Sequence, residues 1–160
     1  FYVVEFRLQQ PLTYCKFVAI KCYTAIMERE LEVIFARASR RMTTPRKEIF
    51  RVFQNSNEPL SVATISTQCS NIDRTSVYRT IELFIQLNVV KPVQLGWRQR
   101  YELADPFKSH HHHLSCTKCN QLVDLQSSQF ENIVGTIAKQ HGFVVTDHTF
   151  EMRGLCSDCR

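Results

Sequence analysis

Apolar residues recur every three or four positions through much of residues 28–87, which is the spacing of amphipathic helices. The helices that this spacing predicts run over residues 28–39, 45–54, 61–69 and 74–87. Ser61 and Asp73 precede the last two helices, where a side-chain oxygen can accept a hydrogen bond from a first-turn N–H group. The apolar residues expected on the buried faces are Leu31, Ile34, Phe35, Ala38, Ile49, Val52, Phe53, Val62, Ile65, Cys69, Val77, Ile81, Phe84, Ile85 and Leu87.

The pattern changes after Asn88, where two short apolar segments at 89–93 and 100–103 flank Gly96. These segments predict two strands joined by a turn. Several helices followed by a two-stranded hairpin are typical of winged helix-turn-helix domains, in which the helix after the turn lies in the DNA major groove. We therefore expect residues 28–103 to form a DNA-binding domain of this kind.

A second, smaller domain is expected at residues 110–160, after a hinge at 104–109. Its predicted elements are strands at 113–116, 121–125 and 143–155 and a helix from Ser127 or Ser128 to about His141. Gly142 is expected to end that helix in the left-handed conformation. A domain of about fifty residues is small for independent stability, so we expect it to pair with a second copy. The predicted fold class is α/β, of the α+β type.

Four of the seven cysteines form two CxxC pairs, Cys116 with Cys119 and Cys156 with Cys159, separated by 36 residues. The two-residue spacer lets both sulfurs of a pair face one ion, and four thiolates complete a tetrahedral zinc shell. Two disulfides are disfavoured without a secretory context. A thioredoxin-like redox motif would have a single CxxC at a strand-to-helix turn. We therefore predict a structural zinc site.

Four consecutive histidines, His110 to His113, precede the first CxxC pair. Alternate side chains on a strand point to opposite faces, so His110 and His112 would serve one site while His111 and His113 serve another. Imidazoles bind iron, nickel, copper or zinc. The alternatives are a solvated polar run and a purification tag, and a tag is disfavoured because the run is internal and continues into Leu114.

The net charge of +5 is unevenly distributed. Residues 28–103 carry twelve Lys or Arg against eight Asp or Glu, whereas residues 104–160 carry five against six. This asymmetry favours polyanion binding by the first half and metal binding by the second. The chain shows no recognisable nucleophile–base arrangement or phosphate-binding loop, so we do not expect an enzyme.

Residues 1–26 are apolar but interrupted by charged residues and a proline. They contain neither the ~18–20 uncharged residues of a membrane span nor the pattern of a signal peptide. Met27 and the charged residues after it are typical of the start of a soluble helix. We therefore interpret residues 1–27 as a leader, which is either a disordered extension or an addition upstream of the true start, and we expect a cytoplasmic location.

Four segments, in the same order as in the family, resemble the ferric uptake regulator family, and the resemblance covers about residues 28–160. They are Thr75–Ile81, Arg100–Leu103, His110–Cys119 and His141–His148. The resemblance implies a homodimeric, metal-responsive winged-helix repressor that occupies double-stranded operator DNA when its metal is abundant. It implies a structural Zn²⁺ and a second divalent metal, Fe²⁺, Zn²⁺ or Mn²⁺, and neither a membrane nor a small-molecule substrate.

The resemblance also implies roles for individual residues. Those facing DNA would be Arg41, Thr75, Ser76, Tyr78 and Arg79. The structural zinc ligands would be Cys116, Cys119, Cys156 and Cys159. The regulatory metal ligands would be Glu102, His111, His113 and Asp124. An additional site would comprise His110, His112, Glu131 and His148. From the helical pattern alone, Tyr78 could also pack under the wing and Arg79 could be a solvated charge.

One feature departs from the family, which usually has a regulatory histidine at the turn before the third helix. This chain has Glu58 and Pro59 at that turn, and residues 1–109 contain no histidine. Either Glu58 replaces the histidine, or the site closes with Glu102 and the three ligands from the second half.

Two rival functions remain. One is a winged-helix module with structural zinc but no metal sensing, and the other is a zinc-dependent hydrolase or metal-storage protein. The hydrolase lacks a recognisable HExxH motif.

Overall fold

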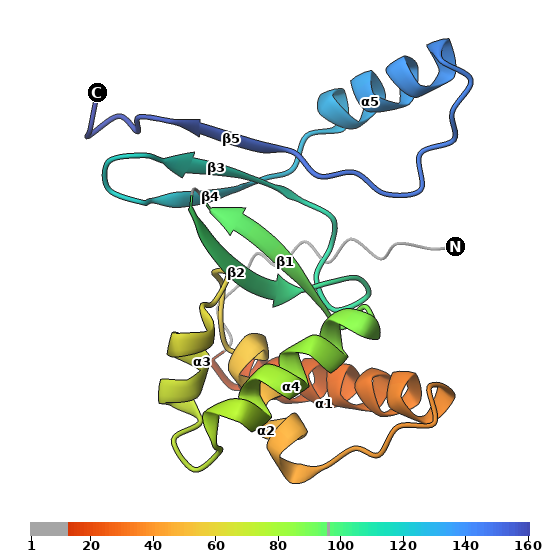
Figure 1. The fold of residues 1–160 in the computed structure, drawn as a ribbon, viewed down its shortest axis with the longest axis vertical. Helices are drawn as coiled ribbons and strands as arrows, with labels where there is room; N and C mark the ends of the chain where they lie inside the picture. Colours follow the sequence, from red (N-terminus) through yellow and green to blue (C-terminus); the bar gives the residue numbers. More distant parts are fainter. Residues whose placement is uncertain (1–12, 96) are drawn as a thin grey trace. The chain divides into compact units, whose positions relative to one another are not determined.

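The computed structural model describes residues 13–95 and 97–160, with side chains from Tyr23 onward (Figure 1). The turn expected at Gly96 lies outside the described residues. The chain forms two compact units, one ending at Thr43 and the other comprising Thr44–Arg160, and each is described by itself. No helix of the described residues has the length and apolar character needed to cross a membrane.

The first unit contains helix α1, which runs from Thr13 to Arg37. Its start corrects the prediction, which placed the first helix at about residue 28. Residues 13–27 contain neither glycine nor proline, so no residue in them interrupts the helical backbone, whereas Pro11 stands just before the helix. The helix ends at Arg37, and Ser39 just beyond it has a left-handed φ of 52°. The expectation of disorder is wrong for residues 13–27, which are helical, whereas an origin upstream of the true start stays a prediction. Residues 1–12 lie outside the described residues.

The second unit begins with the three helices α2 (Thr44–Gln54), α3 (Val62–Gln68) and α4 (Arg74–Gln86). Both predicted caps are confirmed. The Ser61 hydroxyl accepts from the N–H of Thr64 at 3.0 Å, and the Asp73 carboxylate accepts from the N–H of Ser76 at 2.9 Å. The core that these helices share includes Ile49, Phe50, Phe53, Ile65, Cys69, Val77, Ile81 and Phe84.

A two-stranded antiparallel hairpin follows, with β1 at Val90–Leu95 and β2 at Arg98–Leu103. Leu60, from the turn before α3, exchanges backbone hydrogen bonds of 2.7 and 2.8 Å with Tyr101 and so extends the hairpin by an isolated bridge. Figure 1 shows helices α2, α3 and α4 to one side of this hairpin. This is the winged-helix arrangement that the sequence predicts. In the antiparallel register Lys91 lies directly opposite Glu102.

The segment predicted as a hinge, residues 104–109, packs against the helices through Phe107. The Phe107 ring is buried and meets the Phe50 ring edge to face, with 5.0 Å between their centroids. The Ala104 N–H also donates to the Val89 carbonyl at 3.0 Å. These contacts hold the segment on the winged-helix core. The domain limits at 103 and 110 stay a prediction.

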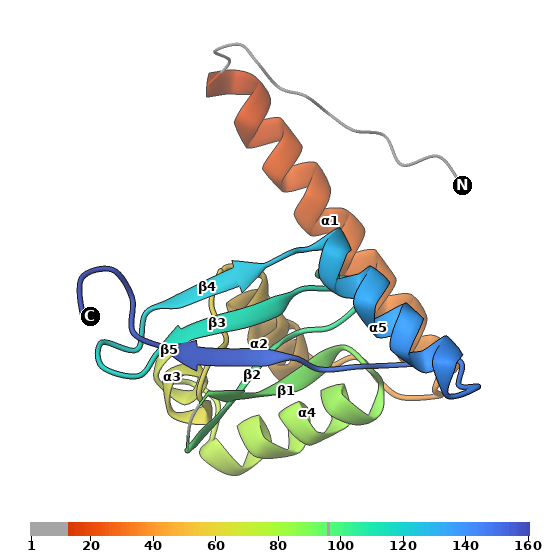
Figure 2. The ribbon, with the colours of Figure 1, turned by 90° about the horizontal axis from the view of Figure 1, so that it is seen from above.

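A three-stranded sheet forms the rest of the second unit, in the order β4-β3-β5 (Figure 2). Its strands are β3 (His112–Cys116), β4 (Leu122–Leu125) and β5 (Glu151–Gly154). Strand β3 pairs antiparallel with β4 and parallel with β5. Helix α5 (Ser128–Gln140) connects β4 to β5, its N-terminus capped by Ser127 and its end followed by Gly142 at a φ of 72°. The predicted mixed fold class is confirmed.

The predicted strand over residues 143–155 is wrong for most of its length, because β5 comprises only Glu151–Gly154. Strand β3 offers only His113 to Cys116 as partners for β5. The preceding alternating segment therefore has no strand to pair with among the described residues. Phe143 and Val144 are accordingly 73% and 89% exposed.

The apolar face predicted for α5 is present but not buried. Ile133 and Ile137 are 56% and 53% exposed, and no residue of α5 is buried. Leu114 and Val123, which are register partners on β3 and β4, are also exposed. The second half therefore exposes apolar area on both its helix and its sheet, which is typical of protein–protein interfaces.

Replacing Phe107 by alanine should lower the free energy of unfolding by about 3–5 kcal/mol, because the change leaves a cavity against Phe50. Urea unfolding followed by circular dichroism measures this difference. Phe143→Ala is the matched control, because that ring is largely exposed and its loss should cost about 0.5 kcal/mol or less. Equal effects of the two substitutions would contradict the packing described for residues 104–109.

Candidate metal centres

The four consecutive histidines divide between two clusters of metal-ligating side chains. His110 and His112 lie together with a centroid separation of 4.7 Å, and His111 and His113 lie together with one of 4.9 Å. His112 and His113 are the first residues of β3 and so point to opposite faces of the sheet, and His110 and His111 continue this alternation just before the strand. The alternation predicted from the sequence is therefore what positions the imidazoles.

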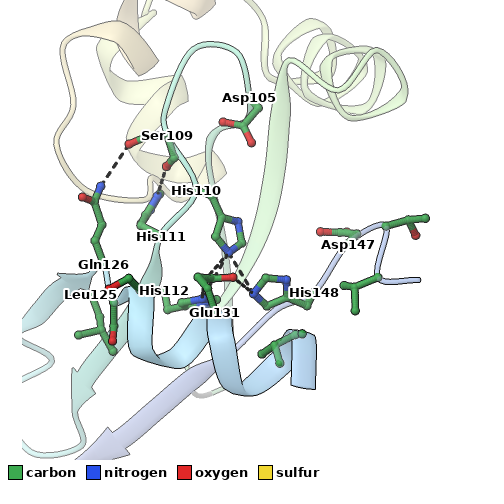
Figure 3. Close-up of a pocket in the computed structure, with 16 residues that line it drawn as sticks. Asp105, Ser109, His110, His111, His112, Leu125, Gln126, Glu131, Asp147 and His148 are labelled. Atoms are coloured by element: carbon green, nitrogen blue, oxygen red, sulfur yellow. Dashed lines mark hydrogen bonds and ion pairs between the residues drawn. The ribbon is translucent and has the colours of Figure 1, made fainter. Parts of the chain in front are cut away.

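The first cluster comprises His110, His112, Glu131 and His148, whose ligand atoms lie within 4.8 Å of one another. Glu131 comes from the first turn of α5 and His148 from the loop before β5. Figure 3 shows these side chains converging, whereas His111 turns toward Ser109. The cluster lines a cavity of about 710 Å³.

The distances in this cluster suit a cation. The Nε2 atom of His110 lies 3.3 Å from that of His112 and 3.2 Å from that of His148. Glu131 lies 2.9 Å from His112 and 3.1 Å from His148, and the hydrogen bond to His112 lowers the pKa of Glu131 despite partial desolvation. Burial lowers the pKa of His110, which favours its neutral, metal-binding form. Three imidazoles and a carboxylate fit a divalent transition metal.

The second cluster comprises Glu102 from β2 and His111 and His113 from the region of β3, all of them buried. The Glu102 Oε2 atom lies 3.0 Å from His111 Nε2 and 3.5 Å from His113 Nε2. His111 Nδ1 lies 2.7 Å from the Ser109 carbonyl oxygen, a contact that assigns its proton to Nδ1 and leaves Nε2 as the ligand atom. His113 Nε2 is buried without a hydrogen-bond partner among the described residues. An orphaned imidazole nitrogen beside a carboxylate fits a missing cation.

Asp124, the fourth residue expected here, lies at the margin of the second cluster. Its carboxylate oxygens are 3.7 Å from His113 Nε2 and 4.0 Å from His111 Nε2, and its side chain is 38% exposed. The register of β3 and β4 places it directly opposite His113. The structure therefore brings Asp124 close to the cluster, but its carboxylate is farther from the two imidazoles than the carboxylate of Glu102 is.

Two lysines that sequence reasoning missed contact the acidic residues of this cluster. Lys108 Nζ lies 2.9 Å from Glu102 Oε2 and 3.1 Å from Asp124 Oδ2, and Lys91 Nζ lies 3.3 Å from Glu102 Oε1. Burial raises the pKa of Glu102, but hydrogen bonding and the charges of Lys108 and His111 outweigh it and hold that pKa well below its usual range. The hairpin register could have revealed Lys91, whereas no sequence signal indicated Lys108.

The structure also bears on the missing family histidine. Glu58 is exposed, and its backbone is held in a local turn by Ser56. It lines a separate cavity with Arg98, Arg100 and Arg153. Among the described residues Glu58 belongs to none of the ligand clusters, so replacement of the histidine by Glu58 finds no support here.

The four cysteines of the two CxxC pairs form the third cluster, with all sulfurs within 4.8 Å of one another. Parallel pairing sets Cys116 opposite Gly154, which brings both CxxC turns to the same end of β3. All four are free thiols, so the alternative of two disulfides is not what the structure contains. Asn120 adopts the left-handed conformation, with a φ of 61°, as its place after the first pair predicts.

The cysteine sulfurs influence one another strongly. Backbone N–H groups of Cys119, Cys156 and Lys118 lower the pKa of Cys116 to about 6. Hydrogen bonding to Cys156, followed by burial, raises the pKa of Cys159 to about 12. Four thiolates this close together repel one another unless a cation lies among them. The all-sulfur donor set fits tetrahedral zinc.

Helix α4 presents the residues expected to face DNA. Thr75 and Arg79 are exposed, Ser76 is half-buried, and Tyr78 is 42% exposed and so is not packed under the wing. Arg74 donates to the Tyr78 hydroxyl at 3.3 Å and lies 5.6 Å from its ring centroid. Arg41 is exposed in the first unit. That these residues contact DNA stays a prediction.

Comparison with known proteins decides the family. A model of the ferric uptake regulator family matches residues 37–153. The chain belongs to this family. A ferric uptake regulation protein of Synechococcus elongatus is 31% identical over 75% of this chain and 86% of its own length. One of Campylobacter jejuni is 34% identical, over 56% of each chain, so that match spans about half of the relative.

A solved structure of the ferric uptake regulator of Francisella tularensis with iron has a TM-score of 0.65 at 25% identity, covering 74% of this chain and 93% of that one. The winged-helix and α/β fold predicted from the sequence is thereby confirmed. The chain therefore belongs to a family of transcriptional regulators and not of enzymes, in agreement with the sequence analysis.

Replacing Cys119 by serine should lower the zinc content by about one equivalent per chain, because three thiolates and a hydroxyl form a weaker shell. Elemental analysis of the purified protein measures the zinc, and thermal unfolding reports the accompanying loss of stability. Cys69→Ala is the matched control, since Cys69 is buried elsewhere and should leave the zinc content unchanged. Equal zinc in both variants would contradict the assignment of the sulfur cluster.

Proposed function

We propose that this protein is a cytoplasmic homodimeric repressor that binds operator DNA when a divalent metal occupies the cluster of Glu102, His111 and His113. One observation carries the proposal. Glu102 belongs to the wing of the DNA-binding half, whereas His113 lies on β3 of the other half and His111 just before that strand, and their ligand atoms meet within 4.8 Å. Such a cluster links the orientation of the reading helix to metal occupancy.

The coupling follows from linkage. A cation bound there neutralises the Glu102 carboxylate and draws β2 and β3 together. The orientation of α4 relative to the sheet is then restricted. The favoured orientation is one in which the two α4 helices of a dimer fit two half-sites about one DNA turn apart. By reciprocity, operator DNA must tighten metal binding by the same factor.

The two other clusters have different proposed roles. The four cysteines hold a structural zinc that ties the two CxxC turns together at the end of β3. His110, His112, Glu131 and His148 form an additional site that ties α5 and the loop before β5 to β3. The imidazole and carboxylate donors of the two nitrogen–oxygen clusters accept Fe²⁺, Zn²⁺ and Mn²⁺, and the similar structure from Francisella tularensis was solved with iron.

The exposed apolar area of the second half supports a homodimer. Ile133 and Ile137 on α5 lie in that half together with Val123 on β4 and the exposed Phe143. Burying such area against a second copy is favourable at about 25 cal/mol per Å². A twofold assembly presents two α4 helices, as a palindromic operator requires.

A second candidate is a winged-helix regulator with structural zinc that binds DNA regardless of the second metal. Lys91 and Lys108 favour it, because their ammonium groups already neutralise Glu102. The two functions differ in one measurable respect, which is whether DNA affinity depends on added divalent metal.

Replacing Arg79 by alanine should weaken binding to a fluorescent operator duplex about tenfold or more, because a guanidinium contact to base or phosphate contributes ~1–3 kcal/mol. Fluorescence anisotropy measures the affinity, and metal content should stay unchanged. Lys139→Ala, which removes one positive charge from the end of α5, is the control and should have little effect. A similar loss of DNA affinity in both variants would mean that Arg79 contributes only its positive charge and makes no specific contact with DNA.

Replacing His111 and His113 together by alanine should abolish the metal dependence of operator binding, because two of the three buried ligands are lost. The same anisotropy assay, run with and without added Mn²⁺, tests this, and retained zinc shows that the fold persists. His141→Ala is the control, since His141 caps the end of α5 outside the three clusters. Full metal response in the double variant would overturn the assignment of the regulatory cluster.

A further inference from the structure

Lys108 stands where the two halves of the second unit meet. It lies between β2 and β3, and its side chain is 27% exposed. Its ammonium group bridges Glu102 on the wing, at 2.9 Å, and Asp124 on β4, at 3.1 Å. Lys91 also contacts Glu102, but it lies opposite that residue on the same hairpin.

The ammonium group competes for the same atoms that a metal ion would use. The Glu102 Oε2 atom accepts from Lys108 at 2.9 Å and also lies 3.0 Å from His111 Nε2. The Asp124 Oδ2 atom is closer to Lys108, at 3.1 Å, than to His111, at 4.0 Å. Lys108 Nζ thus forms ion pairs with both carboxylates that would otherwise bind the metal ion.

The lysine does not satisfy the whole cluster. His113 Nε2 remains buried without a hydrogen-bond partner in the described part of the chain. A metal ion can be coordinated by several nitrogen and oxygen atoms at once, whereas the ammonium group of Lys108 can only donate hydrogen bonds. The lysine stem has four flexible carbons, and its exposed fraction gives the ammonium group a route into solvent. Displacement of the ammonium group by a divalent ion is therefore sterically available.

We propose that Lys108 is a tethered cation that competes with the regulatory metal for Glu102 and Asp124 and so sets the metal concentration at which the protein responds. The proposal rests on the proposed function, because it concerns the regulatory cluster. A metal ion must displace the Lys108 ammonium group from Glu102 and Asp124 before it can bind. The affinity of the cluster for the metal is therefore lower than the same ligands would have without the lysine. In the absence of metal, the ammonium group maintains a weaker bridge between the wing and the sheet.

The test compares Mn²⁺ affinities of full-length variants that all carry His148→Ala to disable the additional site. Electron paramagnetic resonance of free Mn²⁺ measures binding directly, and the sulfur cluster prefers softer ions. Lys108→Met should bind Mn²⁺ at least ~tenfold more tightly, because a unit charge next to two carboxylates is removed. Lys108→Arg, which keeps the charge, and Lys139→Met, which removes a distant charge, should match the parent.

A fourth variant locates the effect. Measured against Glu102→Gln alone, which itself removes a metal ligand, adding Lys108→Met should give a smaller gain, because only Asp124 then remains for the two cations to compete over. Unchanged Mn²⁺ affinity in Lys108→Met would overturn the proposal, as would a gain of the same size in the Glu102→Gln background or an equal gain in Lys139→Met. Zinc content and thermal unfolding, measured on each variant, show that the fold is intact, and Lys108→Arg provides a comparison should the methionine variant fold poorly.

Operator binding separates this proposal from the proposed function. If Lys108→Met fails to bind Mn²⁺ more tightly while DNA affinity still rises with metal, the lysine proposal alone is wrong. If Mn²⁺ affinity rises as expected while DNA affinity is the same with and without metal, the lysine proposal holds and metal-dependent repression is wrong. The expected result is a DNA-binding curve of Lys108→Met that shifts to lower Mn²⁺ concentration by the same factor as its metal affinity.

Discussion

The buried carboxylate of Glu102 is the group on which the arrangement of the second unit depends. It is 4% exposed, and a lone ionised carboxylate at such a position would be strongly destabilising. The chain surrounds it with cationic or imidazole groups from both sides, namely Lys91 on the hairpin, Lys108 on the connecting segment and His111 beside β3. Lys108, which also contacts Asp124 on β4, therefore joins the wing to the sheet, whereas Lys91 lies on the same hairpin as Glu102.

Much of the fold follows from short-range features of the sequence. Ser61 and Asp73 cap their helices because a short polar side chain there can accept from the first-turn N–H groups. The period of two along a strand is enough to sort His110 and His112 from His111 and His113. The sulfur cluster follows from ligand spacing alone.

Other features were beyond the sequence because they depend on long-range partners. The alternation over residues 143–150 is genuine, yet a strand needs a neighbour, and β3 is long enough to pair only with Glu151 to Gly154. The start of α1 was misplaced because the charged residues after Met27 are typical of a helix start, although residues 13–27 contain no glycine or proline that would interrupt the helix. Lys108 gave no signal, since its role arises only when Glu102 and Asp124, 22 positions apart, meet around it.

Strand β3 carries Cys116 at one end and His112 and His113 at the other. Its hydrogen-bonded register with β5 is fixed near the sulfur end, where Cys116 faces Gly154. A strand is stiff along its length, so slippage at the cysteines would turn every imidazole to the wrong face. With the proposed assignments, the ion held by the four sulfurs therefore also supports the strand register on which the imidazole ligands depend.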